Sequence, residues 1–294
     1  MFRVLAALSL VAVASACSDA PVVAKPVPLS AEAYTLSVDA RQALERTLAR
    51  LFGPPDAPRF AVLPGWSEAG FDPNAPAPTG IDDDLAKAVA NDARTRFFDA
   101  LLAVERGKEP EVGSIPASLA ERIASSGDAR AAIETWQPSL AEAARTYQSQ
   151  CVTCHGLAGG GDGPSAAKLD PRPRDFREGA FRFHPGAPES APSQGDLVRT
   201  MRRGIPGSGM PMFGGLGAST QSGLADYVRF LALRGAVERA FVARARDGSV
   251  PTDAEMDEVY AEAWARWAIL PGHEDPREVE GDPVPTTSEE SQEG

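Results

Sequence analysis

The chain has 294 residues, of which 43% are hydrophobic, and a formal net charge of −12 at pH 7. This length and apolar content allow one large or two small domains with an ordinary core, and they exclude a chain that is disordered throughout. The acidic excess argues against nucleic acid as a partner. Three cysteines, two of them only three positions apart, cannot form a disulfide framework.

The N-terminus has the pattern of an export signal. Arg3 gives a positive start, residues 4–14 form an apolar run, and "ASA" at positions 14–16 supplies the small residues of a cleavage site. An apolar run of eleven residues is too short to cross a bilayer as a helix. We therefore predict a signal peptide over residues 1–16.

Cys17 directly follows this cleavage site. After an ordinary secretion signal, it would be an incidental first residue of the mature chain. The run "ASAC" also resembles the lipobox of bacterial lipoproteins, which implies that Cys17 is acylated. Several acyl chains at one residue hold a protein durably on a membrane. The resemblance implies a lipid anchor on the periplasmic side of a bacterial membrane, and Ser18 in place of an aspartate favours the outer membrane.

Pro, Ala and Ser dominate residues 17–37 and predict a lipid-anchored linker. Beyond it, apolar residues recur at helical spacing, and the stretch 54–80, rich in Pro and Gly, predicts a packed irregular segment between helices. The predicted helices up to the cysteine pair cover residues 44–52, 82–107, 117–125, 129–136 and 139–150. Residues 38–137 are therefore predicted to form a helical N-terminal region.

A long irregular region follows the cysteine pair. Residues 156–220 are dense in Gly and Pro, with one helical patch at 195–203, and such a region in a compact domain needs something else to fold around. Three further helices are predicted over residues 220–235, 236–248 and 252–270. The last of them begins with a capping box of Thr252 and Glu255. Its predicted apolar face consists of Met256, Val259, Ala263, Trp267 and Leu270.

The sequence has no alternating strand pattern of useful length, so the predicted fold class is all-α. The predicted division is a signal peptide (1–16), a linker (17–37), a helical N-terminal region (38–137), a central domain (138–240), a C-terminal helical extension (241–272) and an acidic disordered tail (273–294). The central domain has 12 basic and 9 acidic residues, so it is mildly basic inside an acidic chain.

Cys151, Cys154 and His155 have the CxxCH spacing of c-type haem attachment. One helical turn carries two thiols to the two vinyl groups of a porphyrin, and the adjacent imidazole becomes the proximal ligand of the iron. Haem c is attached on the exported side of the membrane, which agrees with the export signal. With Cys17 assigned to lipid and the other two cysteines to haem, the odd cysteine count is explained.

Three other roles for the cysteine pair fit the sequence less well. A structural zinc site needs four ligands, usually from two such clusters, and residues 17–294 contain no second cluster. A redox CxxC follows a strand in a βαβ unit, whereas a predicted helix precedes Cys151. A disulfide between residues three apart leaves His155 unexplained.

Five glycines between positions 156 and 163 either let the chain turn tightly around a flat ring or belong to an ordinary flexible loop.

The iron has a second axial position besides the one taken by His155, and its occupant decides the function. The candidates are Met201, Met210, Met212, Met256 and His184. A methionine more often fills a core, but Met210 lies between Gly209 and Pro211 in a loop and has no helical face to fill.

Four stretches together resemble the class I c-type cytochromes, in particular the cytochrome c domain of respiratory oxidase subunits. "SLAEAARTYQSQCVTCHG" is similar to the family's first helix and haem motif, and "GDGPSAAKLDPRPRDFREGAFRF" to the long loop of one bacterial subgroup. "DLVRTMRRGIPGSGMPMF" resembles the loop of the distal ligand, and "GLADYVRFLALRG" the closing helix. The resemblance covers residues 138–235.

This resemblance implies an all-α cytochrome c fold around one covalently attached haem c, with additional helical segments at both ends. It also implies that His155 is the proximal and Met210 the distal ligand of the haem iron. In this family the first and last helices cross. The residues expected at the crossing are Ala143, Ala144, Tyr147, Tyr227, Phe230 and Leu231.

A haem iron with His and Met on its axes changes charge without needing to bind a substrate. The expected function is therefore a membrane-anchored electron-transfer protein, not an enzyme, which passes single electrons between protein partners of a respiratory chain, alone or within an oxidoreductase complex. The alternative is a haem c enzyme or a gas-binding sensor with an open distal site. Six arginines are expected near the haem propionates or on a docking surface for an acidic partner: Arg172, Arg174, Arg177, Arg182, Arg202 and Arg203.

Overall fold

The computed structural model describes residues 24–69, 71–74, 83–106, 115–126, 128, 136, 138–184 and 191–267. Over these residues the secondary structure is helical without strands, which confirms the predicted all-α class. The elements in chain order are η1 (Ala33–Thr35), α2 (Val38–Phe52), α3 (Asp83–Glu105), α4 (Ala117–Ser126), α6 (Leu140–Gln150), α7 (Val152–His155), η2 (Ala166–Lys168), η3 (Phe176–Glu178), α8 (Gln194–Arg203), α9 (Ala218–Ala245) and α10 (Asp253–Ala265).

Several sequence predictions lie outside the described residues. They are the signal peptide, the lipidation site at Cys17, most of the predicted helix 129–136, Leu270 and the acidic tail. Within the described residues, no helix combines the length and the apolar character that crossing a bilayer requires.

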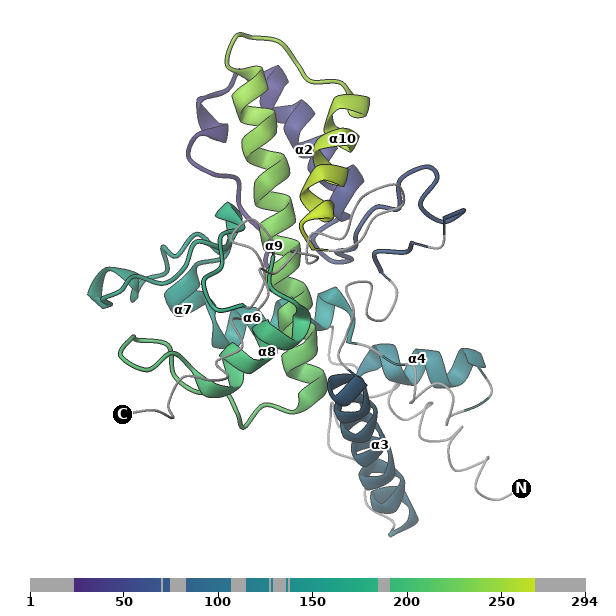
Figure 1. The fold of residues 1–294 in the computed structure, drawn as a ribbon. Coiled ribbons are helices and arrows are strands. Elements are labelled where there is room, and N and C mark those ends of the chain that lie inside the picture. Colours follow the sequence, from purple (N-terminus) through teal and green to yellow (C-terminus); the bar gives the residue numbers. More distant parts are fainter. Residues whose placement is uncertain are drawn as a thin grey trace, which may run out of the picture.

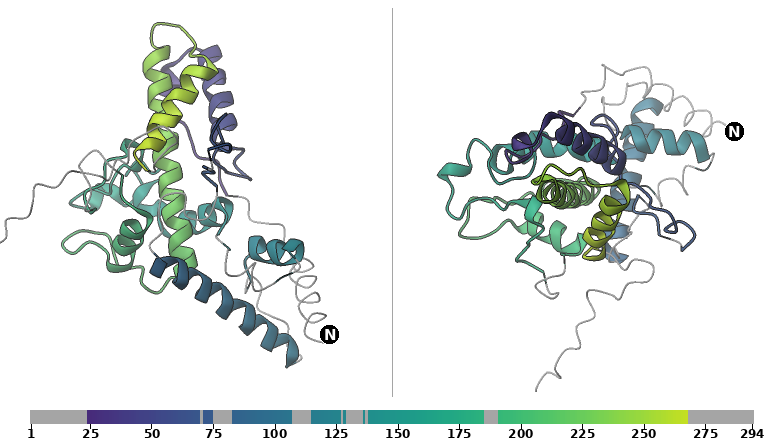
Figure 2. Two further views of the ribbon diagram at one scale, coloured as in Figure 1. Left: turned by 45° about the vertical axis from the view of Figure 1, so that its right-hand side comes forward. Right: turned by 90° about the horizontal axis from the view of Figure 1, so that it is seen from above.

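Helix α9 runs through the middle of the molecule. Figures 1 and 2 show α6 and α8 beside its first half and α2 and α10 beside its second half. Helices α2, α3, α6, α8 and α10 all contact it, and most of its residues are buried. A helix that is apolar on all sides is a core helix, and α9 is the element that joins the predicted central domain to the segments added at both ends.

The structure corrects one prediction about α9. The sequence predicts two helices that meet near Gly235, whereas α9 continues without interruption through this position. A Cβ atom at Gly235 would lie 2.5 Å from the Cβ atom and 2.7 Å from the Cα atom of Arg177, so the glycine lets η3 approach the helix closely. Glycine costs about 1 kcal/mol in a helix, and the packing of η3 against this site offsets that cost.

We expect Gly235→Ala to lower the midpoint of urea unfolding. Alanine gains roughly 1 kcal/mol of helix propensity, but overpacking against the Arg177 backbone costs about 1–3 kcal/mol, so the net effect is destabilising. Gly215→Ala is the control, because no atom lies within 4 Å of a Cβ atom at that loop position. A Gly235→Ala variant more stable than the wild type would show that the contact with Arg177 costs less free energy than the gain in helix propensity.

Asp92 of α3 caps the start of α9 from outside. The N-cap residue of α9, Gly217, has no side chain to accept a hydrogen bond from the first turn. The Asp92 carboxylate takes this role, since it accepts hydrogen bonds from the Ser219 backbone amide, at 3.3 Å, and from the Ser219 hydroxyl. A negative charge at the positive end of the helix dipole adds to the stabilisation, so α3 is tied to α9 at this point.

A buried polar network joins α8 to α9. The Gln194 side-chain amide donates to the Ser222 hydroxyl at 2.8 Å and to the Asp226 carboxylate at 3.1 Å. Arg229 forms an ion pair with the same carboxylate at 3.1 Å. Burial raises the pKa of Asp226, and the Arg229 charge opposes this shift. These contacts fix the position of α8, which carries one of the candidate methionines.

Helix α10 begins with the predicted capping box of Thr252 and Glu255. Met256, Val259 and Trp267 of its predicted apolar face are buried. Ala263 is half-buried and packs against the same core, and Tyr260 and Trp264, which were not part of the predicted face, are fully buried. Where Arg50 of α2 meets α10, it forms an ion pair of 2.5 Å with Asp257.

An aromatic cluster packs the added segments onto α9. Phe52 of α2 lies with its ring centroid 5.5 Å from that of Phe230 of α9 and 5.5 Å from that of Tyr260 of α10. Phe60 from the irregular segment contacts Trp264 of α10 at 4.9 Å. Edge-on aromatic pairs of this kind stabilise a core beyond their burial alone. The N-terminal and C-terminal additions therefore share one core with the central domain.

Residues 24–36, within the predicted linker, lie packed against α6 and α9. The Lys25 backbone amide and carbonyl both bond to the Gln148 side chain, at 3.0 and 2.9 Å. Arg234 of α9 donates to the Val27 carbonyl at 3.1 Å and pairs with Glu238 at 3.1 Å. The composition of this stretch is that of a linker, but its backbone groups bond to polar side chains of α6 and α9.

Candidate haem site

The two cysteines lie on one short helical segment. Cys151 is both the C-cap of α6, where its amide donates to the Tyr147 carbonyl at 2.8 Å, and the N-cap of α7. The His155 amide donates to the Cys151 carbonyl at 2.9 Å. Residues three apart on a helix share a face, and both cysteines line the same cavity. This is the arrangement that the CxxCH spacing predicts.

Tyr147 fixes this segment against α9. Its ring packs at 5.1 Å from that of Tyr227, and its hydroxyl donates to the Gly156 carbonyl at 2.8 Å. Gly223 of α9 lies where a Cβ atom would come within 3.4 Å of the Cβ atom of Ala143. The predicted crossing of the first and last helices is therefore confirmed, with the difference that Phe230 packs on Phe52 of the N-terminal region.

The glycine-rich loop folds back over the end of α7. Gly161 and Gly163 donate their amides to the carbonyls of His155 and Cys154, at 3.0 and 3.1 Å. These carbonyls have no partner within so short a helix, and the loop supplies one. A Cβ atom at Gly163 would lie 2.4 Å from the Val152 carbonyl oxygen, so this position requires glycine for close approach.

A cavity of about 240 Å³ opens beside the cysteine pair. Phe176, Leu197 and Val228 are among the apolar side chains in its wall, which come from α6 to α9 and from the loops between them. Of the residues identified from the sequence, it is lined by Cys151, Cys154, His155, Met201, Met210, Arg172, Arg174 and Arg182. The long irregular region therefore folds around a cavity, as its length predicted.

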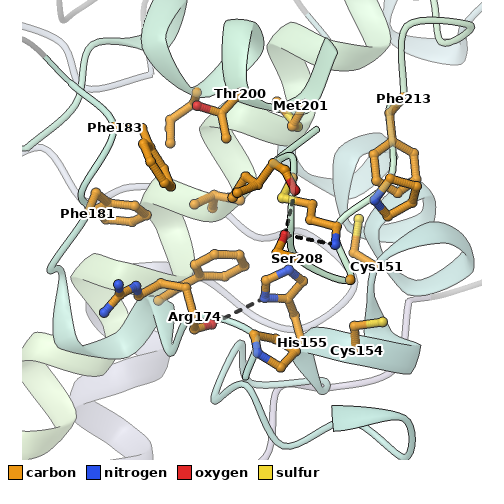
Figure 3. A pocket seen from close by; sticks show the side chains of 18 of the residues that line it. Cys151, Cys154, His155, Arg174, Phe181, Phe183, Thr200, Met201, Ser208 and Phe213 are labelled. Atoms are coloured by element: carbon orange, nitrogen blue, oxygen red, sulfur yellow. Dashed lines mark hydrogen bonds between the residues drawn. The ribbon is translucent and has the colours of Figure 1, made fainter. Parts of the chain in front are cut away.

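His155 is held in one orientation. Its Nδ1 atom lies 3.2 Å from the Arg174 carbonyl oxygen (Figure 3). Its ring stacks on that of Phe176, with centroids 4.4 Å apart. A carbonyl oxygen can only accept, so Nδ1 carries the proton and Nε2 keeps its lone pair. Burial lowers the pKa of His155, and the hydrogen bond to Arg174 opposes this shift. The imidazole is thus neutral and able to bind a metal through Nε2.

Both cysteines of the pair are free thiols and half-buried. Burial raises the pKa of Cys151 to about 12, and the neighbouring Cys154 adds to the shift. The Cys151 thiol is therefore neutral at the edge of the cavity. Thiols, an imidazole with a free Nε2 and an apolar wall form a donor set that fits a haem group.

The structure separates the five candidates for the distal position. Met201 of α8 and Met210 both line the cavity, whereas Met212 does not line it and is 75% exposed. Met256 is fully buried in α10. His184 does not line the cavity, and its Nε2 atom lies 3.1 Å from the Phe181 carbonyl oxygen.

The loop that carries Met210 is braced by its own backbone. The Met210 amide donates to the Ser208 hydroxyl at 3.2 Å, and the Met210 carbonyl accepts from the Ile205 amide at 3.2 Å. Further on, the Phe213 amide donates to the carbonyl of Met201 at 2.9 Å. The loop therefore has a defined fold and is attached to α8 close to Met210.

The six arginines do not act as one group. Arg172, Arg174 and Arg182 line the cavity, as expected for partners of haem propionates. Arg177 turns away and forms two bonds to the Asp175 carboxylate, at 2.7 and 2.9 Å. The remaining two, Arg202 and Arg203, are exposed at the end of α8 and do not line the cavity.

Sequence reasoning missed Phe176 and Phe181 as residues of the site. Both line the cavity, and their rings stack at 6.1 Å from each other. They are large apolar residues in a stretch dominated by Pro, Gly and Arg, and this isolation is a signal that could have identified them.

The helices around α9, the apolar cavity and the CxxCH motif in its wall together define an all-α cytochrome c fold. A family model supports this conclusion, since residues 138–228 match the family described as cytochrome c oxidase, cbb3-type, subunit III. A cytochrome c domain implies covalent haem c and supports a role in electron transfer.

Two further comparisons, with curated proteins and with solved structures, add little to the family match. No curated protein matches the chain. A solved chain of the Kuenenia stuttgartiensis reducing HAO-like protein complex is 31% identical over a match that covers 30% of this chain and 40% of that chain, with a TM-score of 0.29. The match thus spans well under half the length of that relative.

Proposed function

We propose that the protein is an electron-transfer cytochrome with one haem c, bound through thioethers to Cys151 and Cys154 and coordinated by His155 and Met210. The observation that carries the proposal is that both thiols, the oriented imidazole and a loop methionine line one apolar cavity. A haem c in that cavity would supply an iron that accepts and releases single electrons.

The residues of the chain perform the remaining tasks. Arg174 and Phe176 orient the His155 ring and leave its Nε2 atom free for coordination. Apolar groups of the wall exclude water, and low polarity together with a thioether ligand favours a high reduction potential. Arg172 and Arg182 are suited to pair with propionates at the mouth of the cavity.

A redox titration followed by visible spectroscopy tests the proposed function. We expect one reversible one-electron transition and no rapid binding of CO by the reduced protein, because Met210 fills the distal position. Rapid stoichiometric binding of CO would instead support a haem enzyme or a gas-binding sensor with an open distal site. Affinity purification from the native membrane identifies the redox protein partners, whether of a respiratory chain or within an oxidoreductase complex.

The proposed location is the periplasmic side of a bacterial membrane, with the outer membrane favoured by Ser18. The proposal is supported by the lipobox-like "ASAC" and by the chemistry of haem c attachment, which takes place after export. The matched family is described as an oxidase subunit, which is compatible with a respiratory partner.

We expect Cys17→Ala to release the protein from the membrane fraction into the soluble periplasmic fraction while its haem content stays unchanged. The reason is that several acyl chains at one residue supply the membrane affinity, and alanine cannot be acylated. Fractionation followed by haem staining measures both quantities. A variant that stays in the membrane pellet would rule out anchoring through Cys17.

A further inference from the structure

The loop of residues 174–181 contacts His155 on one side and the residues that follow α10 on the other. On the haem side, the Arg174 carbonyl accepts a hydrogen bond from His155 Nδ1, and the Phe176 ring stacks on the imidazole. The Phe176 amide also donates to the Gly159 carbonyl at 2.7 Å, which ties the loop to the glycine-rich segment. Any shift of this loop changes the position of both groups that orient the ligand.

On its other side, the same loop is held by residues that follow α10. Arg266 donates from its Nη2 atom to the Gly179 carbonyl at 3.1 Å. Trp267 is buried and meets the Phe181 ring edge-on at 5.6 Å. Phe181 in turn stacks on Phe176 at 6.1 Å, so a run of packed rings leads from Trp267 to the imidazole.

Two contacts from α9 brace this arrangement. The Arg229 guanidinium lies over the Trp267 ring, 5.6 Å from its centroid, which holds the indole in place. Arg239 of α9 donates to the Arg177 carbonyl in the same loop. Arg239, Arg266 and Trp267 all lie beyond residue 228, where the match to the family model ends.

We infer that Arg266 and Trp267 are positioning residues for the axial ligand His155, acting through the loop 174–181. The inference rests on the proposed function, because it takes His155 as the proximal ligand. A hydrogen bond from Nδ1 to a carbonyl raises the basicity of the imidazole and orients it toward the metal. A more basic ligand stabilises the oxidised iron, so a loosened loop raises the reduction potential.

The test compares the exported full-length protein with its Arg266→Ala and Trp267→Leu variants. Two quantities are measured: amide hydrogen exchange of residues 174–181 and the midpoint potential. We expect exchange in this loop to become roughly tenfold faster, which corresponds to losing about one hydrogen bond, and the potential to rise. Arg266→Lys should restore both in part, since an ammonium group still donates one hydrogen bond.

Arg50→Ala and Arg244→Ala are matched controls. Arg50 binds α10 through Asp257, so its loss weakens α10 packing without touching the loop. Arg244 lies on α9, and its side chain donates a hydrogen bond to the Ala240 carbonyl of the same helix. Both controls should keep the wild-type loop exchange and potential, even where the midpoint of thermal unfolding falls.

Wild-type loop exchange and potential in both Arg266→Ala and Trp267→Leu would overturn the inference. An equal rise of the potential in Arg50→Ala would overturn it too, since the effect would then be one of general stability. Failure of the proposed function looks different: the wild-type protein itself would carry no covalent haem or show no one-electron transition. The exchange measurement would still decide whether Arg266 and Trp267 hold the loop.

Discussion

Replacing Cys151 and Cys154 together by alanine is expected to give an exported chain without covalently bound haem. These thiols are free and line the cavity, so they are the groups available to form thioethers there. On denaturing gels stained for haem peroxidase activity, we expect the signal of the double variant to fall to background. We also expect a lower thermal midpoint, because the apolar cavity that the haem would fill is then left empty.

The single variants are the informative comparison for this result. Cys151→Ala and Cys154→Ala each leave one thiol and should retain at most one thioether. His155→Ala keeps both thiols, so we expect haem to remain attached but with altered absorption, because Nε2 of this imidazole is the proposed proximal donor. A double variant that still stains as strongly as the wild type would place the attachment elsewhere in the chain.

Replacing Met210 by alanine is expected to remove the sulfur-to-iron charge-transfer band of the oxidised protein and to open the iron to CO. It should also lower the midpoint potential by on the order of 0.1 V, a fraction of the roughly 0.8 V range that axial ligands control. The physical reason is that a thioether stabilises the reduced iron. Visible spectroscopy and a redox titration measure these changes.

Two other methionines serve as controls for Met210. Met212→Ala should leave the band and the potential near the wild-type values, because this side chain is 75% exposed and does not line the cavity. Met201 does line the cavity from α8, so Met201→Leu distinguishes a packing role from ligation. Loss of the band in Met201→Leu with retention in Met210→Ala would mean that Met201 is the ligand.

The core of the candidate site was predictable because local sequence determines it. The spacing of Cys151 and Cys154 on one helical turn needs only the geometry of a helix. The helices that surround the site also have local signals, such as the capping box of Ser139 and Glu142 at the start of α6. These features do not depend on distant parts of the chain.

The sequence favours Met210 over Met212 through Pro211, which follows Met210 directly, and through the family resemblance, but not through spacing. In an extended loop both side chains point to the same side, so spacing alone permits either. The bonds from Ile205 and to Ser208 close a turn over residues 206–209, directly before Met210. Only Met210 of the two then lines the cavity.

The continuity of α9 and the docking of residues 24–36 could not be predicted, because both depend on contacts between distant segments. Gly235 ends a helix in most contexts, but here η3 packs against the position that a side chain would fill. The linker-like segment is held by Gln148 and Arg234, more than a hundred residues away in sequence. The contacts of Arg266 and Trp267 with the haem-site loop are of the same kind.

The central claim is that this chain carries haem c on its CxxCH motif, and mass spectrometry of the exported wild-type protein tests it most directly. The account predicts an intact mass increased by one haem and, after proteolysis, a haem-bearing peptide that contains Cys151 and Cys154. An intact mass without haem, after export through a competent maturation system, would contradict the account, and so would haem on any other peptide.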